Sequence, residues 1–331
     1  MENKTLGQKA SYIFFEYNAL VMLVVLVVAS SFLSEAFLST QNITNLLRQL
    51  IPLLLVSIGM LLVILTGGID LAVGSVAAVG GVVLVMVMNG NADGGAFWLI
   101  LSVLAAAGGG ALLGAVTGAF VAFFRMAPFV ASLALMTIAR GIAYIISNGQ
   151  PQRFDREQEA ALILRTFGSK SAPIIDLAWP IVFGALVIAF FYVLMRYTAY
   201  GRLTVATGSN ETAIRLAGIP VARYKLLAYA ACGALSAIAG VVVASRSGVA
   251  TPASGVALEL DAIAACVIGG ALLSGGKGTV VNTVIGVLVL GLIGNIMNLL
   301  SVPAYPQQVI KGAIIILAVL LQGVGRKDAR V

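Results

Sequence analysis

The residues that most suggest chemistry lie in the glycine-rich segment 269–279, GGALLSGGKGT, where Lys277 is typical of a phosphate-binding loop. In such a loop a serine or threonine follows the lysine and binds magnesium. Here Gly278 takes that place, and Ala271 stands where the first glycine of the motif must lie. We therefore predict no nucleotide site, so any transport or work must draw on a partner or on a gradient.

Other catalytic groups are scarce. The chain has no histidine, which excludes histidine-based nucleophile triads and imidazole metal sites. Cys232 and Cys266 lie inside apolar runs without ligand-like spacing, which indicates small packing residues. We therefore expect no catalytic centre and no metal or other cofactor bound by this chain.

Charges inside the apolar runs test whether a gradient could drive the protein, because proton-coupled carriers need ionisable groups deep in a helix. Asp70, Glu259 and Asp261 lie near the ends of apolar runs, Arg140 lies deepest, and Lys311 comes early in the last run. The lack of a carboxylate at a clear midplane position argues against a proton-driven symporter. A gradient-driven secondary transporter acting alone stays the alternative to a protein that takes its energy from a partner.

The composition sets the class of the protein. Hydrophobic residues make up 60% and charged residues 10%, whereas soluble domains have about a quarter charged. The net charge of +7 is spread over loops without interleaved aromatic residues, so we predict no nucleic-acid partner. The chain is expected to be a polytopic membrane protein, with its basic residues marking topology.

Helices of about 20 apolar residues are needed to cross a bilayer. Counting such runs predicts an all-α fold of about ten transmembrane helices in a single domain, residues 1–331. Segment 39–48 is expected to be a short amphipathic stretch before the second helix. The predicted helices are 17–34, 49–66, 71–88, 96–123, 128–147, 178–196, 226–246, 260–274, 280–299 and 306–323.

Ten spans place both termini on one side of the membrane. The segments on that side hold about twice as many basic residues as those on the other, which favours cytoplasmic termini. Loop 196–226 then faces the cytoplasm and loop 148–177 faces outward. The outer loop is either a solvated connector or a landing surface for an extracytoplasmic partner.

Loop 196–226 is strongly basic and contains a short predicted helix, 209–217. Ser209 or Asn210 suits its N-cap, Glu211 its first turn and Arg215 its last turn. Gly218 then supplies a left-handed exit. A helix this short is marginal by itself. It is either an interfacial helix on lipid headgroups or a docking helix for a soluble cytoplasmic protein.

Segment 65–75, LTGGIDLAVGS, interrupts the apolar sequence with Gly67, Gly68 and Asp70. A broken backbone at membrane depth is tolerated only where protein or a water-filled cavity satisfies it. The break therefore either lines a pathway or is a cytoplasmic turn in which Asp70 caps the next helix.

A weak sequence similarity between the runs after Asp70 and Asp261 suggests inverted repeats. Glycines 110, 114 and 118 indicate close helix packing.

Three separated motifs together resemble the ribose-type permeases, the membrane subunits of bacterial ABC importers for monosaccharides. They are 65–75, 201–219 and 259–278, and further similarity at 295–300 and 307–312 extends the resemblance over nearly the whole chain. Gly67, Ala72 and Pro128 depart mildly from the family pattern and leave the particular sugar open.

The resemblance implies a type II importer-like permease in the bacterial inner membrane. Its implied partners are a second copy of itself, a cytoplasmic ABC ATPase that binds ATP and magnesium, and a periplasmic sugar-binding protein, with membrane lipid around it. The implied coupling residues are Gly201, Arg202, Gly208, Asn210, Glu211, Arg215, Leu216 and Gly218. Expected along the translocation path are Gly67, Gly68, Asp70, Gly74, Ser75 and Asp261.

Overall fold

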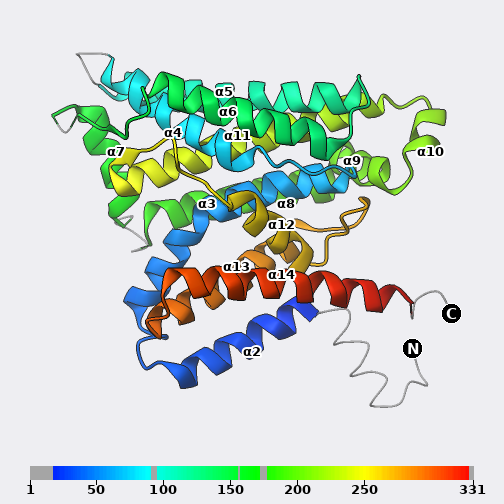
Figure 1. Ribbon diagram of the computed structural model, residues 1–331. Helices are drawn as coiled ribbons and strands as arrows, with labels where there is room; N and C mark the ends of the chain where they lie inside the picture. The colour runs from blue at the N-terminus through cyan, green and yellow to red at the C-terminus, as the bar shows by residue number, and fades with distance from the viewer. Residues whose placement is uncertain (1–17, 91–94, 156, 172–176, 328–331) are drawn as a thin grey trace.

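The structure, a computed structural model, describes residues 18–90, 95–155, 157–171 and 177–327. Most of these residues lie in helices that run side by side, so that the molecule has two distinct ends (Figure 1). At one end, β1 (Gln152–Arg153) pairs with β2 (Val249–Ala250) in a short antiparallel sheet. The predicted helical class is confirmed.

The helices follow in chain order. The first part of the described chain forms α2 (Asn18–Leu33), α3 (Thr40–Leu65), α4 (Val73–Asn89), α5 (Ala96–Ala122), α6 (Pro128–Ile146) and α7 (Glu159–Ser169). The second part forms α8 (Trp179–Tyr197), α9 (Ala199–Ser209), α10 (Glu211–Leu216), α11 (Val221–Ser247), α12 (Leu258–Ile268), α13 (Val280–Leu299) and α14 (Ala304–Lys327).

Six of the described helices are long and apolar enough to cross a membrane: α3, α5, α6, α8, α11 and α13. The helices α2 and α4 are apolar but shorter, and α12 and α14 fall in the two remaining predicted runs. The protein is thus polytopic, as its composition predicts.

Two helices form the centre of the bundle. Within their most apolar windows, 78% of α3 and 61% of α11 are buried, against 22% of α5 and 17% of α8. Large apolar side chains such as Leu104, Leu112 and Phe190 stay exposed on the outer helices. An apolar exterior is what a bilayer requires. Cys232 and Cys266 are buried and free, which confirms that they are packing residues.

Helices α5 and α11 approach each other closely along the predicted glycine stripe. A Cβ atom on Gly114 would lie 2.1 Å from the carbonyl oxygen of Tyr229, and one on Gly110 would lie 2.4 Å from that of Gly233. These side-chain-free positions bring the two backbones into contact, which confirms the packing role predicted for the stripe.

The amphipathic segment expected at 39–48 leads into the second predicted helix as its first turns. The predicted start of that helix at residue 49 is wrong, because α3 begins at Thr40. Ser39 caps the helix by accepting a hydrogen bond from the Asn42 amide at 3.3 Å. The Asn42 side chain bonds to Asn295 of α13, which anchors these first turns. Pro52 lies inside the helix without ending it.

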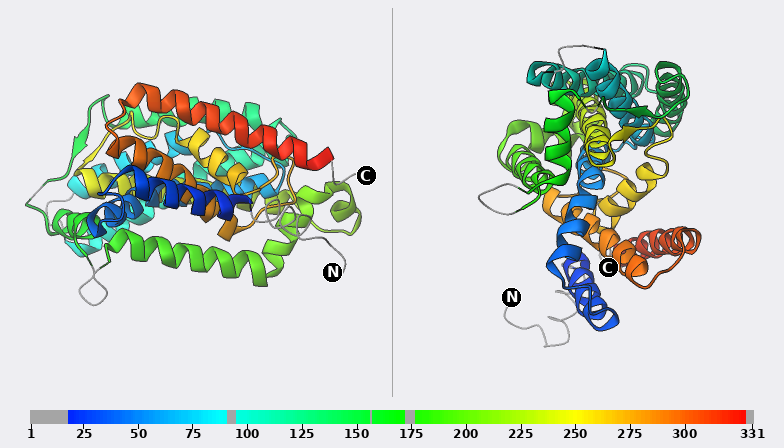
Figure 2. Two further views of the ribbon diagram at one scale, coloured as in Figure 1. Left: turned by 90° about the horizontal axis from the view of Figure 1, so that it is seen from below. Right: turned by 90° about the vertical axis from the view of Figure 1, so that its left-hand side faces the viewer.

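The two ends of the molecule carry different elements. Helix α10 lies at one end, together with the start of α2 and the end of α14, and we call it the α10 end (Figures 1 and 2). At the opposite end, the α7 end, α7 runs across the ends of the other helices (Figure 1). Helix α7 lies within the predicted outer loop 148–177.

Candidate functional site

Helix α10 is the short helix that the sequence predicted at 209–217. Asn210 is its N-cap, and its side-chain oxygen accepts a hydrogen bond from the Ala213 amide at 2.9 Å. Gly218 has a φ of +78°, and its amide bonds back to the carbonyl of Arg215. The predicted N-cap and the predicted left-handed exit therefore both form as expected.

Charged groups tie α10 to the bundle. The Glu211 carboxylate accepts hydrogen bonds from Lys225 of α11 at 2.6 Å and from Arg215 at 2.5 Å. The hydrogen bond from Lys225 lowers the pKa of Glu211 below its ordinary value, although partial burial acts in the opposite direction. Glu211 is therefore ionised at neutral pH and holds α10 against the start of α11.

The outer surface of α10 is accessible. None of its residues is buried, and Leu216 is 84% exposed. Arg215 is also exposed, although it pairs with Glu211. An apolar side chain displayed beside a basic one on a short helix is suited to contact with another protein.

Helix α9 joins α8 to α10 and was not predicted as a separate element. Its Arg202 is exposed, whereas Gly201 is buried. A Cβ atom on Gly201 would lie 2.2 Å from the carbonyl oxygen of Met195. The predicted coupling residues therefore divide into two groups, with Arg202, Arg215 and Leu216 outside and with Gly201 and Gly208 packed inward.

Three glycine-bearing segments meet where α9 ends: 65–68, 208–209 and 275–276, which we call the three-segment junction. The Gly276 amide donates a hydrogen bond to the Leu65 carbonyl at 3.1 Å. A Cβ atom on Gly208 would lie 1.9 Å from that same oxygen, and one on Gly275 would lie 2.9 Å from the Gly67 nitrogen. The three predicted motifs are thus in backbone contact.

Gly67 ends α3 at this junction. It has a φ of +80°, and the amides of Gly67 and Gly68 donate to the carbonyls of Ile64 and Val63. This is the Schellman pattern, which requires a left-handed residue at the position of Gly67. After it, the chain runs in an extended connection to the start of α4 (Figure 1).

The connection from α3 to α4 is buried against α11. Asp70 is 1% exposed, and its carboxylate accepts a hydrogen bond from the Ala72 amide at 2.9 Å. The Tyr229 hydroxyl of α11 donates to the Ile69 carbonyl at 3.2 Å. The segment thus combines a helix-ending turn at Gly67 with an extended backbone that protein groups satisfy, and it has features of both predicted alternatives.

The start of α4 packs against the loop that precedes α12. A Cβ atom on Gly74 would lie 2.1 Å from the Gly255 carbonyl oxygen, and Ser75 is buried. The Arg140 guanidinium of α6 donates hydrogen bonds to the carbonyls of Pro252 and Ser254, at 2.5 and 2.6 Å. Arg140 therefore fixes this loop between α6 and α4.

Asp261 of α12 forms an ion pair with Lys311 of α14 at 3.0 Å. The two side chains are 25% and 33% exposed, so the pair lies at the surface of the single chain. Lys311 is seven residues into α14, about 10 Å from its start at a rise of 1.5 Å per residue. A charge pair at that depth needs a polar environment.

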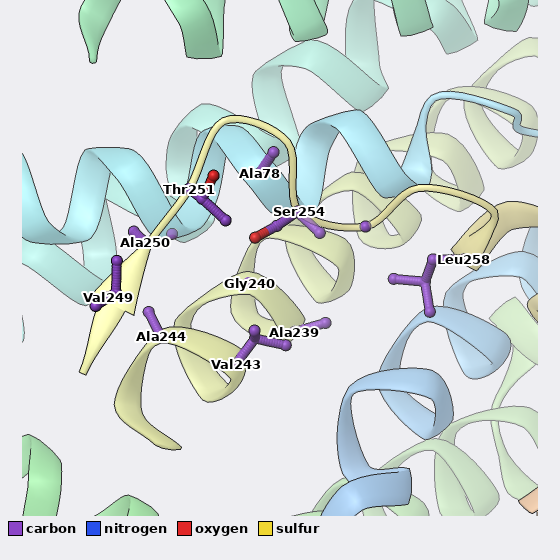
Figure 3. Close-up of a pocket in the computed structure, with 13 residues that line it drawn as sticks. Ala78, Ala239, Gly240, Val243, Ala244, Val249, Ala250, Thr251, Ser254 and Leu258 are labelled. Carbon is purple, nitrogen blue, oxygen red and sulfur yellow. The ribbon is translucent and has the colours of Figure 1, made fainter. Parts of the chain in front are cut away.

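A small pocket lies between α4, α11 and the chain from β2 to α12 (Figure 3). Its volume is about 30 Å³, and its lining is mostly alanine and glycine with the hydroxyls of Thr251 and Ser254. This volume suits one water molecule. A sugar does not fit here, so this pocket is not a substrate site.

The structure places only some of the predicted path residues close to one another. Gly67, Gly68 and Asp70 lie at or beside the three-segment junction, whereas Gly74 and Asp261 lie against or within the segment 251–261. The sequence analysis did not identify Tyr229, and it identified Arg140 and Lys311 without their partners. For these two residues, the available signal was an isolated cation in an apolar run, because such a group needs a partner nearby.

Comparison with known proteins gives the family. The family model described as "Branched-chain amino acid transport system / permease component" matches residues 42–319. The chain is 39% identical to the ribose import permease protein RbsC of Escherichia coli (strain K12), over 92% of this chain and 93% of that one. It is also 39% identical to RbsC of Bacillus subtilis (strain 168), over 90% of each.

The L-arabinose transport system permease protein AraH of Escherichia coli (strain K12) is 36% identical, over 95% of this chain and 92% of that one. No solved structure matches the chain. The family match spans the three-segment junction, α10 and the Asp261–Lys311 pair. The chain therefore belongs to the permease family described as the permease component of the branched-chain amino acid transport system, together with the ribose and L-arabinose permeases.

Proposed function

We propose that this chain is the membrane-spanning subunit of an ATP-driven importer for a monosaccharide, delivered by a periplasmic binding protein. The relatives named as ribose and L-arabinose permeases support a pentose or similar neutral sugar as the substrate. ATP and magnesium are bound by a separate cytoplasmic ATPase, and this chain performs no catalysis of its own.

One observation carries the mechanism: the accessible helix α10 continues directly from α9, whose Gly208 contacts both the end of α3 and the 275–276 segment. A push on α10 by the ATPase therefore reaches two membrane segments through backbone contacts. Because backbone atoms cannot change rotamer, such contacts transmit a displacement with little loss. Arg202, Arg215 and Leu216 form the ATPase-facing surface.

The membrane orientation follows from the same assignment. The α10 end is cytoplasmic, and so are both termini, with ten spans in which α12 is a short one. The excess of basic residues on this side supports the orientation. The α7 end then faces the periplasm and receives the sugar-binding protein.

The sugar passes between two copies of the chain. The partly exposed Asp261–Lys311 pair supports this path, because a pair at this depth is stable beside water or a second protein surface and is costly beside lipid. Gly74 and Ser75 pack behind this face, while Gly67, Gly68 and Asp70 link it to the junction. An inverted repeat relating the halves of the chain would place the path at the repeat interface.

Co-purification with the ATPase subunit tests the docking role of α10. Leu216→Asp should abolish recovery of the ATPase with this chain, while Ala127→Asp, at an exposed position in the connection from α5 to α6, should not. Equal recovery with both variants would exclude α10 as the docking element. For the orientation, Thr212→Cys should react with an impermeant thiol reagent only in opened cells, whereas Ser169→Cys at the α7 end should react in intact cells.

A further inference from the structure

A basic cavity of about 390 Å³ lies at the α7 end, where none of the coupling or path residues is found. Three arginines line it from three different elements: Arg153 of β1, Arg165 of α7 and Arg246 of α11. Ser169, Ser245 and Ser247 contribute polar lining, and no carboxylate does.

The arginines of this cavity lack counter-ions among the described residues. No described carboxylate forms an ion pair with any of the three. The nearby Asp155 instead accepts a hydrogen bond from the Glu157 amide. Like charges that converge on one cavity repel each other unless an anion joins them.

The elements that line the cavity are held in place by close backbone contacts. Helix α7 is held tightly on the end of α11, because a Cβ atom on Gly168 would lie 2.4 Å from the Ser245 carbonyl oxygen. The pairing of Arg153 with Val249 fixes β1 to the residues just after α11. The hydroxyls of the three lining serines all donate to backbone carbonyls: Ser169 to Arg165, Ser245 to Val242 and Ser247 to Val243. Among the lining side chains, the guanidinium groups are therefore the donors available to a ligand.

The depth of the cavity matches the phosphate layer of a membrane. Helix α11 has 27 residues, which at 1.5 Å per residue span about 40 Å, the thickness of a bilayer with its headgroups. Arg246 in its last turn therefore lies at the headgroup level opposite α10. Helix α7 crosses this level and exposes Leu162 and Ile163 beside Arg165, as an interfacial helix does.

From this geometry we propose that the cavity binds the phosphodiester headgroup of an anionic phospholipid in the leaflet at the α7 end. Guanidinium groups form paired hydrogen bonds with the non-bridging oxygens of a phosphate. The volume accommodates a glycerol-phosphate headgroup. Basic pockets between membrane helices bind such headgroups on the cytoplasmic side, and the same charge attraction applies to the leaflet at the α7 end. The bound lipid would join β1, α7 and α11 and so stabilise this end of the protein.

Native mass spectrometry of the protein in mixed micelles of phosphatidylglycerol and phosphatidylcholine tests the site. The wild-type protein should retain phosphatidylglycerol in preference to phosphatidylcholine. The double variant Arg165→Gln, Arg246→Gln should lower this preference by about tenfold or more. The matched control Lys170→Gln removes an exposed cation of the same end that does not line the cavity, and it should change nothing.

Thermal unfolding in nanodiscs gives the second measurement. Phosphatidylglycerol should raise the unfolding temperature of the wild-type protein and of Lys170→Gln, but not that of the double variant. Arg165→Lys, which keeps the charge but loses the paired geometry, should be intermediate. Equal lipid retention by wild type and double variant would overturn the proposal.

Two other results would also overturn it. A rise in unfolding temperature with inorganic phosphate as large as that with phosphatidylglycerol would assign the site to a soluble anion. Loss of affinity for the binding protein by the double variant, with unchanged lipid retention, would assign the arginines to partner docking. None of these measurements uses sugar uptake, so the proposed transport function stands or fails separately.

Discussion

Gly208 at the end of α9 packs directly on the carbonyl oxygen of Leu65, the last residue of α3. That oxygen also accepts a hydrogen bond from the Gly276 amide, so it cannot move away without breaking another contact. The helix that leads into α10 and the membrane helix at the centre of the bundle therefore touch through backbone atoms, which cannot yield by changing a side-chain rotamer.

The contact at Gly208 predicts that Gly208→Ala abolishes coupled transport. Its Cβ atom would overlap the Leu65 carbonyl, and α9 would be displaced from the junction. We expect sugar uptake to fall by about tenfold or more, because an overpacked contact typically costs about 1–3 kcal/mol. Gly141→Ala, where a Cβ atom meets nothing within 4 Å, is the matched control. Normal uptake at equal membrane levels of Gly208→Ala would refute the role of the junction.

Glu211 predicts how the α10 contact responds to pH. Its pKa lies below the ordinary value of 4.5 because Lys225 donates a hydrogen bond to it. A lowered pKa gives stability that is fully present above the ordinary value and is lost as the pH falls through the lowered one. The protection factor of the α10 amides, which is the intrinsic exchange rate divided by the observed rate at the same pH, should therefore be constant from neutral pH down to about 5 and should fall only below 4.5. In Glu211→Gln this acid transition should disappear, and its persistence would assign it to another group.

The Asp261–Lys311 pair predicts a charge-swap result. Asp261→Asn should lower uptake by leaving Lys311 without its partner at membrane depth. Since both groups are partly exposed, the loss of unfolding free energy should be small, about 1 kcal/mol. The double variant Asp261→Lys, Lys311→Asp should recover much of the uptake. Full uptake in Asp261→Asn would show that the pair has no part in transport.

Packing between α5 and α11 predicts a stability effect separate from transport. Gly114→Ala places a methyl group 2.1 Å from the Tyr229 carbonyl and should destabilise the protein by about 1–3 kcal/mol. Gly109→Ala on the same helix meets nothing within 4 Å and should be neutral or slightly stabilising. Thermal unfolding in detergent measures both, and equal unfolding temperatures would contradict the packing described here.

The sequence was most predictive where a local rule decides the structure. The N-cap, predicted at Ser209 or Asn210, is Asn210, and the left-handed exit is at Gly218 as predicted. Both features depend on neighbouring residues alone. The glycine stripe of α5 likewise indicated close packing, because few other roles suit three glycines at helical spacing.

Long-range pairing was beyond local rules. Lys311 and Asp261 are separated by 50 residues, and Tyr229 and Ile69 by 160, so nothing in their spacing predicts contact. The junction was also hidden, because its members contribute backbone atoms rather than distinctive side chains. The continuity of α3 was missed for a related reason: the anchor for its first turns is Asn295, far along the chain.

Reconstitution in vesicles tests the central claim that a separate ATPase drives this chain through α10. Vesicles that contain this chain, the ATPase subunit and the sugar-binding protein should accumulate sugar only when ATP is supplied on the side of α10. Vesicles with this chain alone should accumulate none under an imposed proton or sodium gradient. Concentration of sugar by the chain alone would contradict the account and identify a gradient-driven carrier.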